Sequence, residues 1–421
     1  MRLLHTSDWH LGHTLKEVTR ELEHRAFLTW LSNTLVAEQP DVLVITGDVF
    51  DSATPPASAE RMWFEFLATT RRAHPAMDIV AIAGNHDSPA RLSASASVLR
   101  ELSVHVVGGL PRCSSGELDI DRIVIPVGRG QGWVAAIPFL RPVDFPTTAA
   151  ADPTTSIYAE VLEQARRRKT ADQALVVLGH LYVAGADPSL LSERRVSVGG
   201  LESASTRMFP SDIDYVALGH MHRAQRVGRD SIRYAGAPIA LALDEASYHH
   251  QVVVVDFVGG RAADIRPIAV PQAIEIVRIP PRGAAPLAEV LTAIESLAPR
   301  DSAADISRPY LDLMISLDRP EPRLRTLIER ALDGKHPRLV QLRIVHSGTG
   351  HVLGDRESTK RLAELDPRDV FEQLWARSHA DPPGEAVTRA FDRLLAEVRG
   401  DREDPAERKP ASPQLQLGGV A

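Results

Sequence analysis

The sequence lacks most features of secreted and membrane proteins. Cys113 is its only cysteine, which excludes an internal disulfide framework and fits a reducing compartment. No apolar run approaches the roughly 20 residues that a membrane span needs. The polar residues His5, Thr6 and Asp8 come too early for the apolar region of a signal peptide. We therefore expect a cytoplasmic protein without a membrane segment.

Two further absences concern ATP and nucleic acids. The chain has no glycine-rich P-loop, so we do not expect it to hydrolyse ATP itself. It also lacks a basic excess, since 55 acidic residues against 48 Lys and Arg give a net charge of −7. Because phosphate binding depends on local cations, this acidic balance indicates that a partner contributes much of any DNA surface. The basic run 166–169 ends a predicted helix and is expected to be a solvated face.

The chain is long enough for more than one domain. Its 421 residues and hydrophobic content of 44% suffice for two or three domains with sizeable cores. Up to about residue 110, short runs of Val, Ile and Leu alternate with helices expected near 16–38, 57–74 and 88–101. Strands dominate residues 120–270. The first part of the chain is therefore predicted to be an α/β domain.

The pattern changes after Pro271. Three strands and two helices alternate between residues 274 and 345, which predicts a small α+β domain. Two amphipathic helices are expected between 366 and 398, and the residues after Gly400 lack periodicity and are rich in charge and proline. The predicted domains are residues 1–270 (α/β), 271–350 (a cap), 351–400 (helical) and 401–421 (a disordered tail).

Polar side chains follow five apolar runs, at the point where each predicted strand ends. In four of the five runs a glycine precedes the polar residue and allows the backbone to turn out of the strand. Because ligands bind outside the carboxyl ends of strands in open α/β sheets, five strand ends in one sheet would place these side chains in a single crevice. The side chains are Asp8, His10, Asp48, Asn85, His86, Asp87, His180, His220 and His222.

Carboxylate, amide and imidazole donors in this order are typical of a metal site. Seven donors, with His86 and Asp87 left aside, are too many for one ion but suit two six-coordinate ions that share the Asp48 carboxylate. The lack of thiolate argues for manganese, iron or zinc in an open site. Taken singly, residues 84–87 are an ordinary turn, but the ordered series of five segments argues against that interpretation. The lone histidines expected on the surface or in packing are His13, His24, His74 and His105.

The order D-x-H, G-D, G-N-H-D, G-H, G-H-x-H resembles the calcineurin-like metallophosphoesterase pattern. The resemblance implies a four-layer sandwich, with two mixed sheets flanked by helices, that hydrolyses a phosphate ester at two divalent metal ions. It makes His86 the catalytic histidine, which protonates or stabilises the departing oxygen and is oriented by Asp87. It assigns a first metal position to Asp8, His10, Asp48 and His222, and a second metal position to Asp48, Asn85, His180 and His220.

The residues around these motifs narrow the substrate class. Protein phosphatases with this metal site continue the second motif with Arg-Gly and write the third as G-N-H-E, whereas this chain has Ser52-Ala53 and Asp87. Archaeal and eukaryotic nuclease relatives carry a histidine where this chain has Asp51. We expect Asp51 either to support the metal-binding residues from outside or to shape the loop. The stretches 5–12, 137–142, 217–225, 234–238 and 308–312 are similar to the SbcD family of bacterial nuclease subunits.

By this resemblance the chain is a manganese-dependent DNA exonuclease and endonuclease at DNA ends or hairpins, in DNA repair, recombination and replication. The implied partners are DNA and an SbcC-like coiled-coil ATPase. Association with DNA implies a location at the nucleoid. The cap, residues 271–350, would face the DNA. Residues 351–400 would dock that ATPase, and packing of their helices onto the cap is the alternative. A homodimer within a heterotetramer is also implied, through the helices near 57–74 and 88–101. The apolar residues Met62, Trp63 and Phe66 could equally be core residues.

Two other functions stay open on the sequence alone. A stand-alone phosphodiesterase that acts on small nucleotides would need neither a cap nor partner-binding helices. A scaffold whose metals only hold structure is the non-enzymatic alternative. The uncoordinated His86 argues against the scaffold, because a structural site has no use for a histidine beside an open water position.

Overall fold

A computed structural model describes most of residues 1–346 and a few residues after them. The described ranges are 1–145, 152–187, 204–300 and 307–346, together with 371, 375, 383–384 and 387–391. Met1–Ser347 form one compact unit and Gly348–Ala421 a second. The helical segment predicted at 351–400 lies almost wholly outside the described residues, and the tail predicted at 401–421 lies entirely outside them. Within the described ranges, no helix combines the length and apolar character that a bilayer span requires.

The first sheet is built from the short runs of branched apolar residues. Its strand order is β14-β13-β1-β4-β5-β6. Strands β1, β4, β5 and β6 are parallel, and β13 pairs antiparallel with both of its neighbours, β1 and β14. Two helices, α1 (Glu21–Glu38) and α2 (Ala57–Ala73), bury an apolar stripe against its outer face. The strands are β1 (Arg2–Thr6), β4 (Val42–Thr46), β5 (Asp78–Ile82), β6 (Val104–Val107), β13 (Gln251–Val258) and β14 (Arg261–Ala269).

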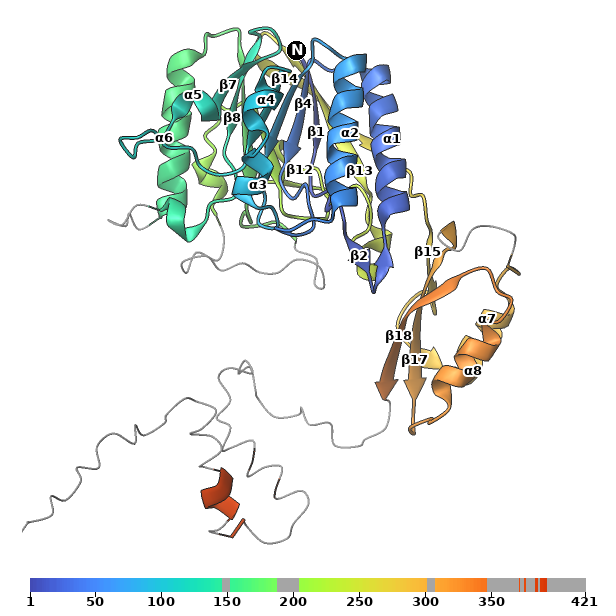
Figure 1. The fold of residues 1–421 in the computed structure, drawn as a ribbon. Helices are drawn as coiled ribbons and strands as arrows, with labels where there is room; N and C mark the ends of the chain where they lie inside the picture. Colours follow the sequence, from blue (N-terminus) through green and yellow to red (C-terminus); the bar gives the residue numbers. More distant parts are fainter. Residues whose placement is uncertain are drawn as a thin grey trace, which may run out of the picture. The chain divides into compact units, whose positions relative to one another are not determined.

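A second mixed sheet packs against the first. Its order is β11-β12-β10-β9-β8-β7, and α6 (Pro153–Arg168) covers its outer face. Fully buried side chains from both sheets, among them Val44, Val80, Val134 and Val176, form the layer between them. Figure 1 shows α1 and α2 on one side of the sheets and α6 on the other. The strands are β7 (Val124–Val127), β8 (Gly132–Ala136), β9 (Ala174–His180), β10 (Tyr215–Gly219), β11 (Gln225–Val227) and β12 (Arg229–Tyr234), and a short α5 (Ile120–Ile123) precedes β7.

The α/β sandwich with two mixed sheets is therefore confirmed, but one expectation about it is wrong. The five motif-bearing strands do not lie in one sheet: β1, β4 and β5 belong to the first sheet, and β9 and β10 to the second. A run of apolar residues specifies a buried strand but not its neighbour. The crevice is formed where the strand ends of two facing sheets meet.

Local differences from the predicted helices have simple causes. Residues 14–19 form the hairpin β2 (Thr14–Leu15) and β3 (Val18–Thr19) instead of helix, because Lys16 and Glu17 adopt positive φ of 49° and 70° at its turn. The helix expected at 88–101 is two short ones, α3 (Pro89–Ser93) and α4 (Ala96–Arg100). Met62, Trp63 and Phe66 are buried in the core under α2, which decides between the two interpretations of these residues.

The basic run at the end of α6 is fully paired. Arg166 binds Asp212, Arg167 binds Glu163, and Arg168 binds Asp121 on the surface. Lys169 reaches the buried carboxylate of Asp214. These ion pairs favour the expected role of the run as a solvated face of the helix.

Beyond residue 270 the chain forms a third sheet with a core of its own, here called the cap. Its central strand β17 (Tyr310–Leu317) pairs in parallel with β15 (Ile276–Ile279), β16 (Ala285–Pro286) and β18 (Arg338–His346). Parallel neighbours need crossover connections, and α7 (Leu287–Glu295) and α8 (Leu324–Ala331) are those connections. Their apolar faces pack on the sheet around Ile294, Leu313 and Ile328.

Candidate metal centre

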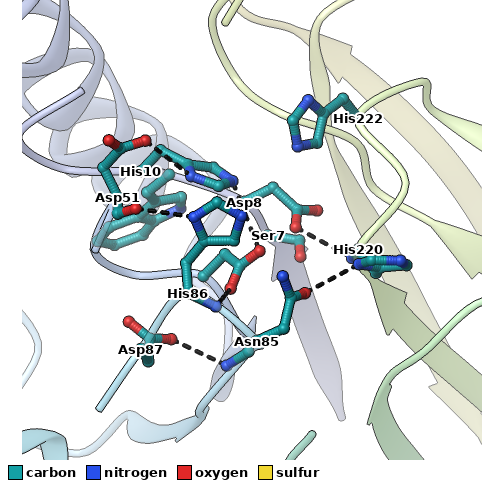
Figure 2. Close-up of polar contacts among 12 residues, drawn as sticks. Ser7, Asp8, His10, Asp51, Asn85, His86, Asp87, His220 and His222 are labelled. Carbon is teal, nitrogen blue, oxygen red and sulfur yellow. Dashed lines mark hydrogen bonds and ion pairs between the residues drawn. The ribbon is translucent and has the colours of Figure 1, made fainter. Parts of the chain in front are cut away.

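The side chains predicted to bind metal lie at or shortly after the ends of β1, β4, β5, β9 and β10, and they come together in one cluster. Figure 2 labels Asp8, His10, Asn85, His220 and His222 of this cluster. Four of the predicted metal-binding residues have left-handed backbone conformations, with φ of 54° at Asp8, 48° at His10, 47° at Asp48 and 98° at His220. A non-glycine residue in this region costs about 1–3 kcal/mol and persists only where the surroundings enforce it. The concentration of such residues in one cluster is typical of a functional site.

Glycine is required beside these residues for two different reasons. Gly47 has a φ of 96°, so it does allow the sharp turn after β4. Gly84 and Gly219 have no such φ and are needed because other groups approach closely. A Cβ atom at Gly84 would lie 2.1 Å from Asp48 Oδ1, and one at Gly219 would lie 1.9 Å from the carbonyl oxygen of Thr46. Conformational freedom, the reason expected from the sequence, therefore explains only part of the pattern.

The first metal position brings together three of its expected donors within bonding range of one ion. Ligand atoms of Asp8, His10 and His222 lie within 4.8 Å of one another. Asp8 Oδ1 accepts the backbone N–H of His220 at 3.0 Å, which directs Oδ2 inward. Among the described residues, Asp8 Oδ2 and His10 Nε2 are buried atoms without a hydrogen-bond partner. Buried polar atoms are costly unless they are paired, and a cation at this point would pair both.

The second position is assembled around Asn85. Its side-chain oxygen lies 2.9 Å from His180 Nε2 and 3.0 Å from His220 Nδ1. Asp48 Oδ2 lies 3.3 Å from the same His180 nitrogen and 3.6 Å from His10 Nε2. Asp48 therefore faces both groups of donors, as a carboxylate shared by two ions does. The Nδ1–H group of His180 donates to the Thr46 carbonyl oxygen at 2.9 Å, which leaves Nε2 for the site.

The charges in the cluster favour a cation. Burial lowers the pKa of His180, but the neighbouring Asp48 and Asp8 outweigh this effect and raise it to about 9. The His180 imidazolium in turn holds the pKa of Asp48 well below its usual range, against the effect of burial. Burial and the nearby His180 charge lower the pKa of His220 to about 3. The carboxylates thus attract positive charge to the point where the donors converge.

His86 lies beside this cluster with one nitrogen already bonded. Its backbone N–H donates to Asp48 Oδ1 at 2.9 Å, and its ring Nδ1–H donates to the carbonyl oxygen of Asp51 at 2.7 Å. The ring packs edge-on against His10 with centroids 4.7 Å apart. Nε2 is therefore the nitrogen left to face the cleft.

Asp87 makes contacts other than the expected ones. Its carboxylate accepts backbone N–H groups from Gly84, Val49 and Phe50 at 2.9 to 3.1 Å, so it joins the loops after β4 and β5. Burial and the nearby Asp48 raise its pKa to about 6. The orientation of the His86 ring comes from the Asp51 carbonyl oxygen instead. Sequence spacing did not indicate this, because any residue supplies a carbonyl group.

Three residues beside the centre support it, and only Asp51 among them was expected from the sequence to do so. The carboxylate of Asp51 accepts Nδ1–H of His10 at 3.2 Å and of His13 at 2.9 Å. Glu245 is fully buried and accepts Nδ1–H of His222 at 2.8 Å. Carboxylates that bind the second nitrogen of a metal-binding histidine fix its orientation and raise its basicity. His13 is half-buried and packs against the centre through its bond to Asp51, which fits the packing role expected for it, and Glu245 is far in sequence from every motif.

The centre opens into a cleft of about 1000 Å³. His10, Asn85, His86 and His222 line its inner end. The half-buried Arg141 donates to the carbonyl oxygens of Gly84 and Asp87 and so holds the loop that carries His86. Among the residues lining the opening are Lys16, and Gln341 and Arg343 of the cap.

The donor set fits divalent metal ions. It combines buried carboxylate, amide and imidazole groups, and two of its atoms, Asp8 Oδ2 and His10 Nε2, lack a hydrogen-bond partner among the described residues. None of these donor residues is a cysteine. Such N/O sites suit manganese, iron or zinc ions with positions left for water. Asp8, His10, Asp48, Asn85, His180, His220 and His222 are the residues that would hold them.

Comparison with known proteins covers nearly the whole sequence. The calcineurin-like phosphoesterase family matches residues 1–224, and the family described as type 5 capsule protein repressor C-terminal domain matches residues 270–379. The chain is 38% identical over 383 residues to the SbcD subunit of nuclease SbcCD from Rhodobacter capsulatus, which covers 88% of this chain and 91% of that protein. The SbcD protein of Escherichia coli strain K12 is 29% identical over 96% of this chain and its own full length. That of Bacillus subtilis is 35% identical over 62% of this chain and 68% of its own.

Proposed function

Because the chain belongs to the calcineurin-like phosphoesterases, and within them to the SbcD nuclease subunits, we propose that it cleaves DNA phosphodiester bonds at a dinuclear manganese centre. It is a metal-dependent nuclease, a hydrolase that works as a subunit of an SbcCD complex. The proposal adds two ions per chain, manganese as their identity, and action at DNA ends or hairpins. The observation that carries it is the convergence of seven donors, Asp48 among them, with Asp8 Oδ2 and His10 Nε2 buried and unsatisfied.

The residues of the chain have distinct roles in this proposal. When bound, the cations supply charge that polarises the phosphoryl oxygens and lowers the pKa of the attacking water. Asp48 holds the two positions together, and Asp51 and Glu245 orient the imidazoles of His10 and His222. His86 Nε2 faces the cleft and donates a proton to the departing oxygen, while Asp51 holds its other nitrogen. Asp87 keeps the loop of His86 against the loop of Asp48.

The second component of the proposed complex is an SbcC-like coiled-coil ATPase. The names of the relatives, which place them in SbcCD, support it, and so does the absence of a P-loop from this sequence. We propose residues 351–400 as its docking segment, DNA as the substrate, and the cytoplasm, at the nucleoid, as the location. Access of duplex DNA to the cleft would then depend on the ATPase.

We further propose that two copies form a homodimer within a heterotetramer. Phe64 of α2 and Val98 of α4 are exposed apolar side chains on the two helical regions expected to form the dimer. Molar mass by light scattering during gel filtration tests this directly. One copy of this chain per particle at micromolar concentration, both for the protein alone and for its complex with the ATPase, would contradict it.

The test of the function is the variant His86→Ala, assayed on linear duplex DNA with manganese, the ATPase and ATP. Loss of cleavage with two ions still bound supports the role of His86. Unchanged cleavage with retained metal would overturn that role. His249→Ala is the matched control, because this histidine is exposed and remote in sequence from every motif.

The stand-alone phosphodiesterase is the alternative, although the SbcD relatives do not favour it. A chain that ends after residue 350 keeps the whole first compact unit and separates the two functions. The nuclease of the SbcCD type loses its ATP-dependent DNA cleavage in this chain. A phosphodiesterase for small nucleotides keeps its full activity, because it requires no docking segment.

A further inference from the structure

Both histidines of the first metal position, His10 and His222, are linked by hydrogen bonds to one short segment outside the centre. The link to His222 runs through Glu245, and the link to His10 runs through His13 and Asp51. We call Ala240–Glu245 the Leu241 segment. The backbone N–H of Leu241 donates to Glu245 Oε2 at 2.7 Å, and the other oxygen of Glu245 accepts Nδ1–H of His222 at 2.8 Å. The carbonyl oxygen of Leu241 accepts a hydrogen bond from His13, whose other nitrogen binds Asp51. Asp51 accepts the ring N–H of His10.

The other side of the Leu241 segment is bound by the cap. Arg278 of β15 donates directly to the carbonyl oxygen of Leu243 at 2.8 Å. Arg20 donates to the carbonyl oxygen of Ala240 at 2.6 Å and forms a two-pronged ion pair with Glu23. The hydroxyl group of Tyr310, the first residue of β17, donates to Glu23 at 2.6 Å.

Burial makes these contacts specific. Arg20 and Glu23 are only 1% and 3% exposed, so each depends on the partners within its reach. Removal of one partner from a buried charged network leaves a charge uncompensated, which is costly. Leu15, Leu243, Ile274 and Tyr310 form an apolar cluster around the same junction. The cap therefore contacts the segment through polar bonds and through apolar packing.

The second metal position has no such connection among the contacts of the described residues. His180 is oriented by the carbonyl oxygen of Thr46, at the end of β4. His220 and Asn85 contact each other directly. Thr46 is the last residue of β4, and Asn85 and His220 lie just beyond the ends of β5 and β10, so the two positions differ in their dependence on the cap.

We infer that Tyr310 and Arg278 of the cap are positioning residues for the first metal position, through the Leu241 segment. This inference rests on the dinuclear centre proposed above. The cap is thereby part of the metal site and not only a surface for substrate. A displaced cap weakens binding at the first position and leaves the second unchanged.

The test is a manganese titration of the metal-free full chain by calorimetry, for the wild type and for Tyr310→Phe. Loss of the hydroxyl group is expected to keep two ions per chain and to weaken one of the two binding constants about three- to tenfold. This is less than the roughly 10- to 100-fold loss expected for Glu245→Gln, which removes a direct partner of a metal-binding histidine. When Tyr310→Phe and Glu245→Gln are combined, the fold-loss of manganese affinity is smaller than the product of the two separate fold-losses, because both residues act on one network.

Ser296→Ala is the control, because it removes a cap hydroxyl group whose hydrogen bond to a described residue stays at the end of α7, where it donates to the carbonyl oxygen of Ala293. Arg278→Lys is a second variant, which keeps a charge beside Asp312 but cannot reach Leu243 in the same way. Wild-type constants in both Tyr310→Phe and Arg278→Lys, or equal losses at both positions, would overturn the inference. If the wild type itself binds fewer than two ions, the proposed dinuclear centre fails instead.

Discussion

The backbone N–H of His86 donates to Asp48 Oδ1 at 2.9 Å. The residue proposed to protonate the departing oxygen is thus bonded to the carboxylate proposed to join the two metal ions. Asp48 Oδ2 faces His180 and His10 at the same time. One aspartate therefore sets the distance between the catalytic histidine and both metal positions.

Asp48→Asn is expected to abolish binding of the two metal ions together. The change keeps the shape of the side chain and removes the charge that both positions share. Because even partners outside the coordination sphere are worth about 10- to 100-fold, DNA cleavage should fall by about 100-fold or more. Metal content by mass spectrometry and cleavage of linear DNA measure the two effects. Asp256→Asn, at the remote ion pair with Arg2, is the control, and two retained ions in Asp48→Asn would refute this role.

Asp51→Asn separates two functions of one residue. The carboxylate orients His10 and His13, while the backbone carbonyl oxygen holds His86 and is kept in the variant. We expect manganese affinity at one position to fall about tenfold. At saturating manganese, kcat should return to near the wild-type value, because His86 keeps its partner. A kcat that stays low at saturation would show that the carboxylate acts on the chemical step itself.

Gly84→Ala tests the close approach between the loops after β4 and β5. The new Cβ atom would lie 2.1 Å from Asp48 Oδ1, so the carboxylate or the loop has to move. Metal affinity should fall at both positions, since Asp48 belongs to both. Gly384→Ala, where a Cβ atom meets no atom of the described residues within 4 Å, should bind manganese as the wild type does. Wild-type affinity in Gly84→Ala would mean that the loops adjust without effect.

Stability should fall with acid because of buried neutral histidines. Burial lowers the pKa of both His5 and His24 from 6.5 to about 3. The unfolded chain binds these protons near pH 6.5 and the folded chain does not, so stability is present above that pH and is lost as the pH falls toward 3. At pH 5.5 the loss is about 1.4 kcal/mol for each histidine.

Urea unfolding of the metal-free protein at pH 7.5 and pH 5.5 measures this loss. In His24→Gln the difference between the free energies of unfolding at the two pH values should be about 1.4 kcal/mol smaller than in the wild type. His24 is fully buried and bonds the carbonyl oxygen of Trp9, so the variant is compared with itself at the two pH values. An unchanged difference would mean that His24 carries its proton in the folded protein.

The strands that end at the metal centre were predictable because runs of Val, Ile and Leu are specific for buried strands. Asp8, His10 and Asp48 follow such runs directly and were predicted without knowledge of the sheets. The division into two sheets was not predictable, since apolar runs do not encode their neighbours. Glu245 was also beyond prediction, because it lies 23 residues from His222 and a single glutamate carries no pattern.

The cap illustrates a second limit of the sequence. Its strands and helices follow from alternating apolar runs, but the bond from Tyr310 to Glu23 joins residues separated by 287 positions. Contacts of this kind depend on how domains pack, and a residue type alone does not predict them. Side chains that support a site through one intermediate are therefore found only in the structure.

Electron paramagnetic resonance of the metal-free chain, titrated with manganese, tests the central claim most directly. Two ions that share the Asp48 carboxylate are magnetically coupled, so two equivalents per chain should produce an exchange-coupled spectrum. Asp48→Asn should lose that spectrum. A saturated wild-type chain with one ion, or with two ions whose spectra are independent, would contradict the dinuclear centre.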